Sequence, residues 1–514
     1  MAYGRRSLSP HHTKLEMELL LCLLLSVLAA SLFYYNMNTN RRRSGTGRRL
    51  PPGPRQLPVV GNFLDLRHGN LHHTLAHLAR VHGPVLRLRL GLATAVVISS
   101  RDAAREAFTR HDRRLAAHAV PDTTRALGFS DRSMIWLPSG DPRWRTLRGV
   151  VATHVFSPRS LAAARGVRER KVRDMVEHIR GRAGREVDVG QLVYSGVLNL
   201  VSSVLLSVDL VDMGTESAQG FRELVEGLIQ LVGKPNISDN FPFLRPLDLQ
   251  GWRRCMAKQF EKLFRVFDDI IDHRLAEASS GDKHGDFLDA LLELMSTGKM
   301  ARDNVKTILV DVFAAGSDTI SVTVEWAMAE LLRNPGIMAK VRVEIEGTLG
   351  SKETVEEPDV AGMPYVQAVI KEAMRLHPVA PLMLPHLAMD DGIEIGGYAV
   401  PKGSSVIFNT WAIMRDPAAW ERPDEFVPER FLDTAAEVDF WGKHFEFIPF
   451  GAGRRVCPGI PMAERVVPLI LASLLHAFEW RLPNGVAAEE LDVSEKFAAA
   501  NVLAFPLRAV PVIA

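Results

Sequence analysis

The sequence predicts a mainly helical fold with a small β portion, preceded by a single-pass membrane anchor near the N-terminus. Most long segments show the apolar spacing of amphipathic helices, whereas short β-like runs are few and dispersed along the chain. One uncharged apolar run lies close to the first residue. Strand–helix–strand repetition is not visible, and this argues against a Rossmann-type fold.

The overall composition is that of a large folded protein with balanced charge. The 514 residues include 62 Lys and Arg against 60 Asp and Glu, which gives a formal net charge of +2. This balance argues against a nucleic-acid partner, since such proteins normally carry a basic excess. Hydrophobic residues make up 47% of the chain, so a disordered protein is excluded. The three cysteines, Cys22, Cys255 and Cys457, are too few for a disulfide framework and favour a reducing compartment.

The N-terminal region divides into three parts ahead of the globular domain at 62–514. Residues 1–18 form an extension in which either Met1 or Met17 is the start. Residues 19–35 carry no charge and span about 26 Å as a helix, the short end for a membrane anchor. The basic, Pro-rich hinge at 36–61 follows, and its arginines place the globular domain in the cytosol by the positive-inside rule. A cleaved signal peptide is the alternative to an anchor.

Within the globular domain, turn residues separate the predicted helices from the predicted strands. Glycine pairs and Pro-Gly or Lys-Gly steps lie at the ends of several runs. The clearest helical periodicity lies at 161–180, 260–278, 304–333 and 338–349. The β-like runs lie at 85–90, 95–99, 393–400, 404–409 and 502–513.

The most informative segment is F-G-A-G-R-R-V-C-P-G at 450–459, just before a helical pattern. Its glycines allow close backbone approach, and its arginines and the helix N-terminus favour a thiolate at Cys457. Because no second Cys or His stands nearby at zinc spacing, a single thiolate ligand suits haem iron better than zinc. A structural cysteine buried in a turn is the alternative.

The predicted helix 304–333 carries A-G-S-D-T at its centre, from Ala315 to Thr319. A glycine inside a helix costs about 1 kcal/mol, so Gly316 calls for a reason. One reason is close packing against another helix. The other is a local opening of the helix over a cofactor, in which the Thr319 hydroxyl bonds the Ala315 carbonyl and leaves room for a diatomic molecule.

These motifs resemble those of the cytochrome P-450 monooxygenases. The segment 450–459 fills all five fixed positions of their haem signature, F-x-x-G-x-R-x-C-x-G, and the similarity runs from the Pro-rich hinge to the C-terminus. The resemblance implies the P-450 fold and a haem-thiolate catalytic domain at 62–514. It also implies haem b (iron protoporphyrin IX) with Cys457 as the axial ligand, Arg455 on a haem propionate, and Phe450 and Gly451 beside the sulfur.

The resemblance further assigns residues on either side of the haem. The A-G-x-D-T pattern implies that Asp318 and Thr319 relay protons to bound oxygen; Ile320 departs from the Thr or Ser that the family often has there. Trp144 and Arg148, spaced as W-x-x-x-R, read alone as a surface cation–π pair, but the resemblance places both on the propionates. His386 is a third candidate propionate contact.

A supporting charge cluster is also implied. Glu372 and Arg375 at i and i+3 would ordinarily be a solvated ion pair on a helix surface. However, they match the family's E-x-x-R helix, and P-E-R-F at 428–431 matches its following loop. The resemblance therefore implies a buried network of Glu372, Arg375 and Arg430 that supports the Cys457 loop structurally.

The chain is most similar to plant microsomal members, in the group of geraniol hydroxylases and grass diterpenoid hydroxylases. This implies an O2-dependent monooxygenase that receives electrons from a separate NADPH-dependent cytochrome reductase. It would hydroxylate a lipophilic small molecule, a terpenoid, at the endoplasmic reticulum membrane with its catalytic domain facing the cytosol. The alternatives are a haem-thiolate isomerase or dehydratase that does not use O2, and a non-catalytic haem protein. Asp318 and Thr319 favour the monooxygenase.

Overall fold

The computed structural model describes residues 22–23, 25–27, 30–31, 49–67, 69–213, 215–278, 283–433, 435–483, 485–497 and 500–514. The predicted extension 1–18, most of the predicted anchor 19–35 and the first part of the hinge lie outside these residues. All three cysteines are described, and each is unpaired.

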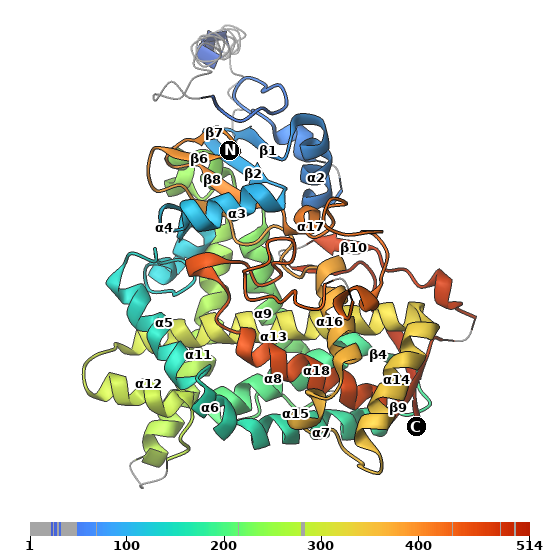
Figure 1. Cartoon of the computed structure of the whole chain (residues 1–514). Coiled ribbons are helices and arrows are strands. Elements are labelled where there is room, and N and C mark those ends of the chain that lie inside the picture. The colour runs from blue at the N-terminus through green and yellow to red at the C-terminus, as the bar shows by residue number, and fades with distance from the viewer. Residues whose placement is uncertain are drawn as a thin grey trace, which may run out of the picture.

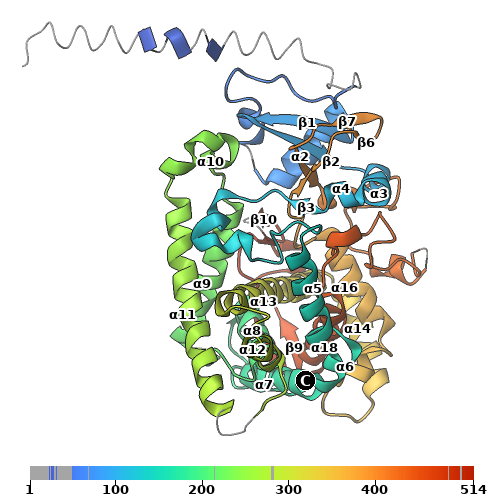
Figure 2. The ribbon, with the colours of Figure 1, turned by 90° about the vertical axis from the view of Figure 1, so that its left-hand side faces the viewer.

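Helices dominate the described chain, and they fill the lower part of the molecule in Figure 1. Figure 2 shows α9 and α11 side by side along one flank. The bounds are α2 (Leu71–His82), α3 (Arg101–Arg110), α4 (Asp112–Leu115), α5 (Pro142–His154), α6 (Pro158–Ala163), α7 (Arg165–Arg180), α8 (Val189–Leu206), α9 (Glu216–Gly233), α10 (Ile237–Asn240), α11 (Trp252–Ala278), α12 (Phe287–Ser296), α13 (Arg302–Arg333), α14 (Pro335–Leu349), α15 (Glu357–Val360), α16 (Pro364–Leu376), α17 (Thr410–Ile413) and α18 (Ile460–Ala477).

In the residues that the structure describes, the β portion is split among four small sheets. The largest has the strand order β1-β2-β8-β5-β3 and lies at the upper end of the molecule with α2 and α3 (Figure 1). In it, β2 runs parallel to β8 and antiparallel to β1. Its strands are β1 (Val85–Leu90), β2 (Ala93–Ile98), β3 (Ala117–His118), β5 (His386–Leu387) and β8 (Ser405–Phe408). The others are β4 (Val187–Asp188), β6 (Ile393–Ile395), β7 (Tyr398–Val400), β9 (Phe478–Arg481), β10 (Glu495–Phe497), β11 (Asn501–Leu503) and β12 (Arg508–Ile513).

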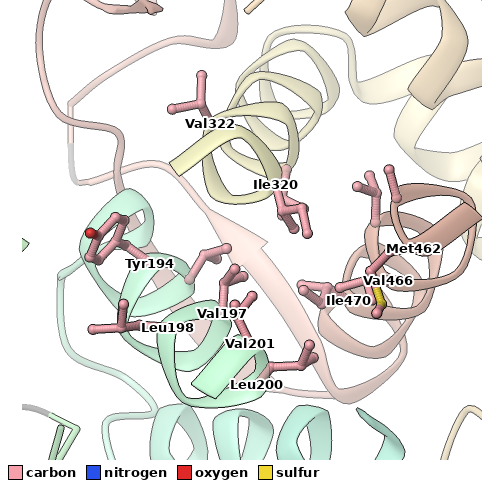
Figure 3. Packing of buried hydrophobic residues seen from close by; sticks show 14 of the residues in the cluster. Tyr194, Val197, Leu198, Leu200, Val201, Ile320, Val322, Met462, Val466 and Ile470 are labelled. Carbon is pink, nitrogen blue, oxygen red and sulfur yellow. The ribbon is translucent and has the colours of Figure 1, made fainter. Parts of the chain in front are cut away.

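Part of the largest hydrophobic core lies between α8, α13 and α18. In Figure 3, Val197 and Val201 of α8, Ile320 of α13 and Ile470 of α18 point toward one another. By length and composition, these three helices are the described ones that are apolar enough to cross a membrane. However, 89% of the most apolar window of α8 and 72% of those of α13 and α18 are buried inside the fold. Their apolar composition therefore matches core helices.

The predicted elements are largely present, with shifts where turn residues intervene. The predicted helix at 161–180 is divided, because α6 ends at Ala163 before α7 begins. The run 393–400 is a hairpin of β6 and β7, since Gly396 and Gly397 adopt φ of 59° and 78°, a region that glycine tolerates. The run 502–513 is interrupted and contributes to two different sheets.

Candidate functional site

Cys457 lies in a tight loop between the short 3-10 helix η5 (Gly453–Arg455) and α18. Its backbone N–H donates to the Phe450 carbonyl at 3.0 Å, and its Sγ accepts from the Gly459 N–H at 3.3 Å. Gly453 has a φ of 68°, and a Cβ added there would lie 2.3 Å from Asp112 Oδ1, so the turn requires glycine.

The electrostatics at Cys457 differ from the sequence-based expectation. Burial raises the pKa of the thiol, and the Gly459 N–H and the charge of Arg148 offset this only in part. The loop alone therefore does not favour a thiolate. A bound metal cation would supply the missing compensation, since coordination to a metal deprotonates a thiol.

Two arginines flank the cysteine loop without acidic partners. Arg148 Nη2 donates to the Val456 carbonyl at 2.7 Å, and the Arg455 guanidinium lies 4.9 Å from the ring centroid of Trp144. In the part of the chain that the structure describes, neither arginine forms an ion pair, and the buried Trp144 Nε1 has no hydrogen-bond partner. Burial lowers the pKa of both arginines, that of Arg455 to about 10. Two half-buried cations and a free N–H donor are the chemistry that fits an anionic group with carboxylates.

Backbone carbonyls orient Arg455. Its Nε donates to Ala116 O at 3.0 Å and its Nη1 to Met134 O at 3.1 Å, and its Nη2 donates to Leu137 O. These carbonyls come from segments more than three hundred residues earlier in the chain. The guanidinium is thus fixed from outside its own loop.

Two histidines lie beside Arg455 on paired strands. His386 of β5 is opposite His118 of β3, with ring centroids 5.2 Å apart. Each Nδ1 donates to a backbone carbonyl at 2.7 Å, which leaves Nε2 as the free ring nitrogen. Burial, aided by the charge of Arg455, lowers the pKa of His386 to about 4. The sequence analysis missed His118. Its only signal is the strand register with His386, which no local pattern reveals.

The A-G-S-D-T motif lies in the middle of α13. Thr319 Oγ1 donates to the Ala315 carbonyl at 2.7 Å, the bond the sequence predicts. The helix is continuous from Arg302 to Arg333, however, so the expected local opening is not seen. A Cβ on Gly316 would lie 3.8 Å from Val201, an ordinary contact, and close packing does not require glycine there either.

Thr319 lies on an accessible face of α13, and the residues next to it in the sequence lie on buried faces. Ala315 and Thr319 are exposed, whereas Asp318 and Ile320 on either side of Thr319 are buried. Ile320 points between α8 and α18, so its departure from the family pattern serves core packing (Figure 3). Burial and the nearby Glu226 carboxylate, opposed in part by Arg222, raise the pKa of Asp318 to about 6.

The predicted charge cluster is buried, and its ion pair between Glu372 and Arg375 is bidentate. Arg375 Nε and Nη2 donate to the two Glu372 oxygens at 2.7 and 2.9 Å, and Arg430 Nε donates to Glu372 Oε1 at 3.0 Å. Glu372 and Arg375 are both 0% exposed, so the surface ion-pair interpretation does not hold. Arg375 also donates to the carbonyls of Met414, Pro423 and Glu425, which ties α16 to the segment before the cysteine loop.

The comparison with known proteins agrees with this geometry. The family model described as Cytochrome P450 matches residues 51–503. The chain belongs to the cytochrome P450 family. It is 64% identical to "Cytochrome P450 76M5" of Oryza sativa subsp. japonica, over 96% of this chain and 99% of that protein. It is 61% identical to "Oryzalexin D synthase" and 60% identical to "Ent-cassadiene C11-alpha-hydroxylase 1" of the same organism, each over 96% of this chain and 98% of the relative.

Membership in the P450 family establishes the class of chemistry. The chain is a monooxygenase with a haem-iron cofactor that uses O2, a redox partner reductase and a lipophilic substrate. The structure brings the Cys457 loop, Arg455, Arg148 and Trp144 together, and it places His386 beside them.

Proposed function

We propose that this P450 binds haem b through Cys457 and hydroxylates a terpenoid with electrons from an NADPH-dependent cytochrome reductase. The observation that carries the proposal is a half-buried thiol beside two arginines that form no ion pair with any carboxylate in the described chain. Those groups match an iron porphyrin, which offers a metal for the thiolate and propionates for the cations.

Each predicted haem contact has a group available for it. Cys457 supplies the axial sulfur, and Phe450 and Gly451 lie in the loop that closes beside it. The propionates would accept hydrogen bonds from Arg455, Arg148 and Trp144 Nε1. His386 lies beside these residues, with Nε2 as its free ring nitrogen. When bound, the haem iron supplies O2 activation. The Glu372–Arg375–Arg430 network keeps the cysteine loop in register and takes no part in the reaction.

Two residues on α13 supply protons in this proposal. Thr319 Oγ1 is fixed by its bond to the Ala315 carbonyl, and Thr319 lies on the accessible side of the helix. Asp318, with a pKa raised to about 6, exchanges protons near neutral pH. With haem bound, proton delivery at Thr319 would direct the electrons into product formation, whereas its loss would leave two electrons and two protons to reduce O2 to hydrogen peroxide.

Thr319→Ala is therefore expected to uncouple electron flow from product formation. NADPH consumption should continue, while product formed per NADPH falls at least about tenfold, because a positioned proton donor contributes about 10²–10⁴ to rate. The measurement is parallel assay of NADPH, product and hydrogen peroxide.

Thr323→Ala is the matched control for that substitution. Thr323 Oγ1 makes the same kind of bond, to the Thr319 carbonyl at 2.8 Å, one turn further along the helix. Its coupling should equal that of the unchanged enzyme. An unchanged yield per NADPH in Thr319→Ala would remove Thr319 from the relay.

The substrate class rests on the relatives and on apolar surfaces. A relative 60% identical is named for hydroxylation of ent-cassadiene. Ile135, Val312 and Val379 are partly buried apolar residues that pack against the main hydrophobic core. Apolar surfaces of this kind, with few polar groups, suit a hydrophobic substrate.

Incubation of microsomes with ent-cassadiene, NADPH, reductase and O2 tests the substrate class. The expected product is heavier by one oxygen atom, and omission of any one component should stop its formation. Product that forms without O2 would support the isomerase or dehydratase alternative. Failure to oxidise ent-cassadiene and a panel of other terpenoids, despite an intact haem-thiolate spectrum, would overturn the terpenoid assignment.

Location and electron supply complete the proposal. The apolar run at 19–35 and its following arginines support an endoplasmic reticulum anchor with the catalytic domain in the cytosol. Near the cysteine loop, a cavity of about 810 Å³ is lined by arginines from four elements, and this basic surface suits an acidic reductase. The arginines are Arg110, Arg113, Arg114, Arg145 and Arg454.

A further inference from the structure

Asp311 is a buried acid on α13 that the proposed proton relay does not use. It lies about one helical turn before Ala315 and is 2% exposed. Its carboxylate accepts from Ser133 Oγ at 2.7 and 3.0 Å and from the Met134 N–H at 2.7 Å. Within the described chain, no lysine or arginine forms an ion pair with it. A buried carboxylate without a counter-ion depends on such donors, so Asp311 and this loop stabilise one another.

Met134 connects Asp311 to the cationic group of the site. Its N–H donates to Asp311, and its carbonyl accepts from Arg455 Nη1 at 3.1 Å. The same loop offers Leu137 O to Arg455 and Ile135 O to His118 Nδ1. The loop 133–137 is therefore held by α13 on one side and by Arg455 and His118 on the other.

We propose that Asp311 is a positioning residue that fixes the loop 133–137 and, through Met134, holds the Arg455 guanidinium in place beside the haem site. The inference rests on the proposed haem site. It adds that the helix carrying Thr319 and the cation assigned to the propionates are coupled through one loop residue. Asp311 itself touches neither the cofactor nor the substrate in this proposal.

Removal of the Asp311 carboxylate should displace the Arg455 guanidinium. In Asp311→Ala, the Met134 N–H and the Ser133 hydroxyl lose their acceptor, and a buried donor without an acceptor shifts its segment toward solvent. The Met134 and Leu137 carbonyls then no longer hold Arg455. In Asp311→Asn, the amide oxygen still accepts from Met134, so this conservative variant should retain the arrangement.

The test uses the full-length enzyme loaded with haem. Two readouts are followed, the haem reduction potential and the dissociation constant of 4-phenylimidazole from the Soret shift. Asp311→Ala is expected to lower the potential, because a nearby cation favours the reduced haem and that cation is displaced. It is also expected to raise the dissociation constant of 4-phenylimidazole about tenfold. This corresponds to the loss of one buried hydrogen bond to a charged group. Asp311→Asn should stay within about twofold of the unchanged enzyme.

Two further variants distinguish positioning from general destabilisation. Asp303→Asn is the matched control, because Asp303 lies on the same helix, is 59% exposed and pairs with Arg132 and Lys306 at the surface. It should change neither readout. Ser133→Ala removes one hydrogen-bond donor to Asp311 and keeps the Asp311 carboxylate. It should lower the haem reduction potential by less than Asp311→Ala does. It also provides a result if Asp311→Ala fails to fold.

A double-mutant cycle with Arg455→Gln provides the decisive comparison. If Asp311 acts through Arg455, the potential shifts of the two single variants should not add in the double variant. Additive shifts, or an unchanged potential in both Asp311→Ala and Ser133→Ala, would overturn the inference. Failure of the proposed function is distinguished by the unchanged enzyme. In that case its reduced, carbon monoxide-bound spectrum would lack the thiolate-type band.

Discussion

Replacement of Cys457 by serine is expected to abolish the thiolate-type Soret band of the reduced, carbon monoxide-bound enzyme and to lower turnover more than about 100-fold. Groups that only orient a metal ligand already cost about 10–100-fold when removed, so loss of the ligand itself should cost more. Serine is nearly isosteric with cysteine, and its hydroxyl can still accept from the Gly459 N–H that contacts Sγ. The loop should therefore persist while the ligand chemistry changes.

The measurement is a carbon monoxide difference spectrum of the membrane fraction, with Cys255→Ser as the control. Cys255 is exposed at the start of α11 and is unpaired, so its replacement should leave the spectrum unchanged. A thiolate-type band that survives in Cys457→Ser would exclude Cys457 as the axial ligand. A histidine-type band in the unchanged enzyme would support the non-catalytic alternative.

Arg375→Leu is expected to lower the free energy of unfolding by about 3–5 kcal/mol. The substitution leaves Glu372 with the Arg430 guanidinium and the Val427 N–H as donors, and it leaves three backbone carbonyls without the guanidinium of Arg375. Breaking a buried ion pair by removal of one partner typically costs that amount, because a buried charge loses its compensation. Denaturant unfolding of the haem-free protein, followed by intrinsic fluorescence, measures the loss.

Arg422→Leu is the control for this prediction. Arg422 and Glu425 also form an i, i+3 pair, at 3.0 Å, but their side chains are 57% and 58% exposed. Its loss should cost less than about 1 kcal/mol, as for other surface ion pairs. Equal costs for Arg375→Leu and Arg422→Leu would mean that burial does not determine the contribution of the Glu372 network.

Local motifs were predictable because their information lies within a few residues. The Cys457 loop needs its glycines and its following helix, and the bond from Thr319 to Ala315 follows from a spacing of four. Burial of Glu372 and Arg375 was accessible only through the family resemblance, since their spacing alone is typical of a surface pair.

Features that depend on long-range contacts were not predictable in the same way. His118 is positioned by strand pairing with His386. Asp311 is positioned by hydrogen bonds from a loop 177 residues earlier, so the sequence around neither residue indicates its role. The helix α8 was missed for a different reason. Nearly every residue of α8 is buried, so the alternation of apolar and polar faces that marks a helix in sequence is absent.

The carbonyls that hold Arg455 also have a consequence for biosynthesis. They belong to residues that precede the arginine by 318 to 339 positions. At about 5–20 residues per second, the ribosome makes Met134 and Leu137 roughly 15 to 65 s before their partner emerges. The cations and the thiol that we propose as cofactor ligands therefore meet only after Cys457 has left the ribosome, and haem loading at this site is expected to follow the synthesis of these earlier segments. Nascent chains stalled before Arg455 should accordingly carry no haem, however well their earlier helices have packed.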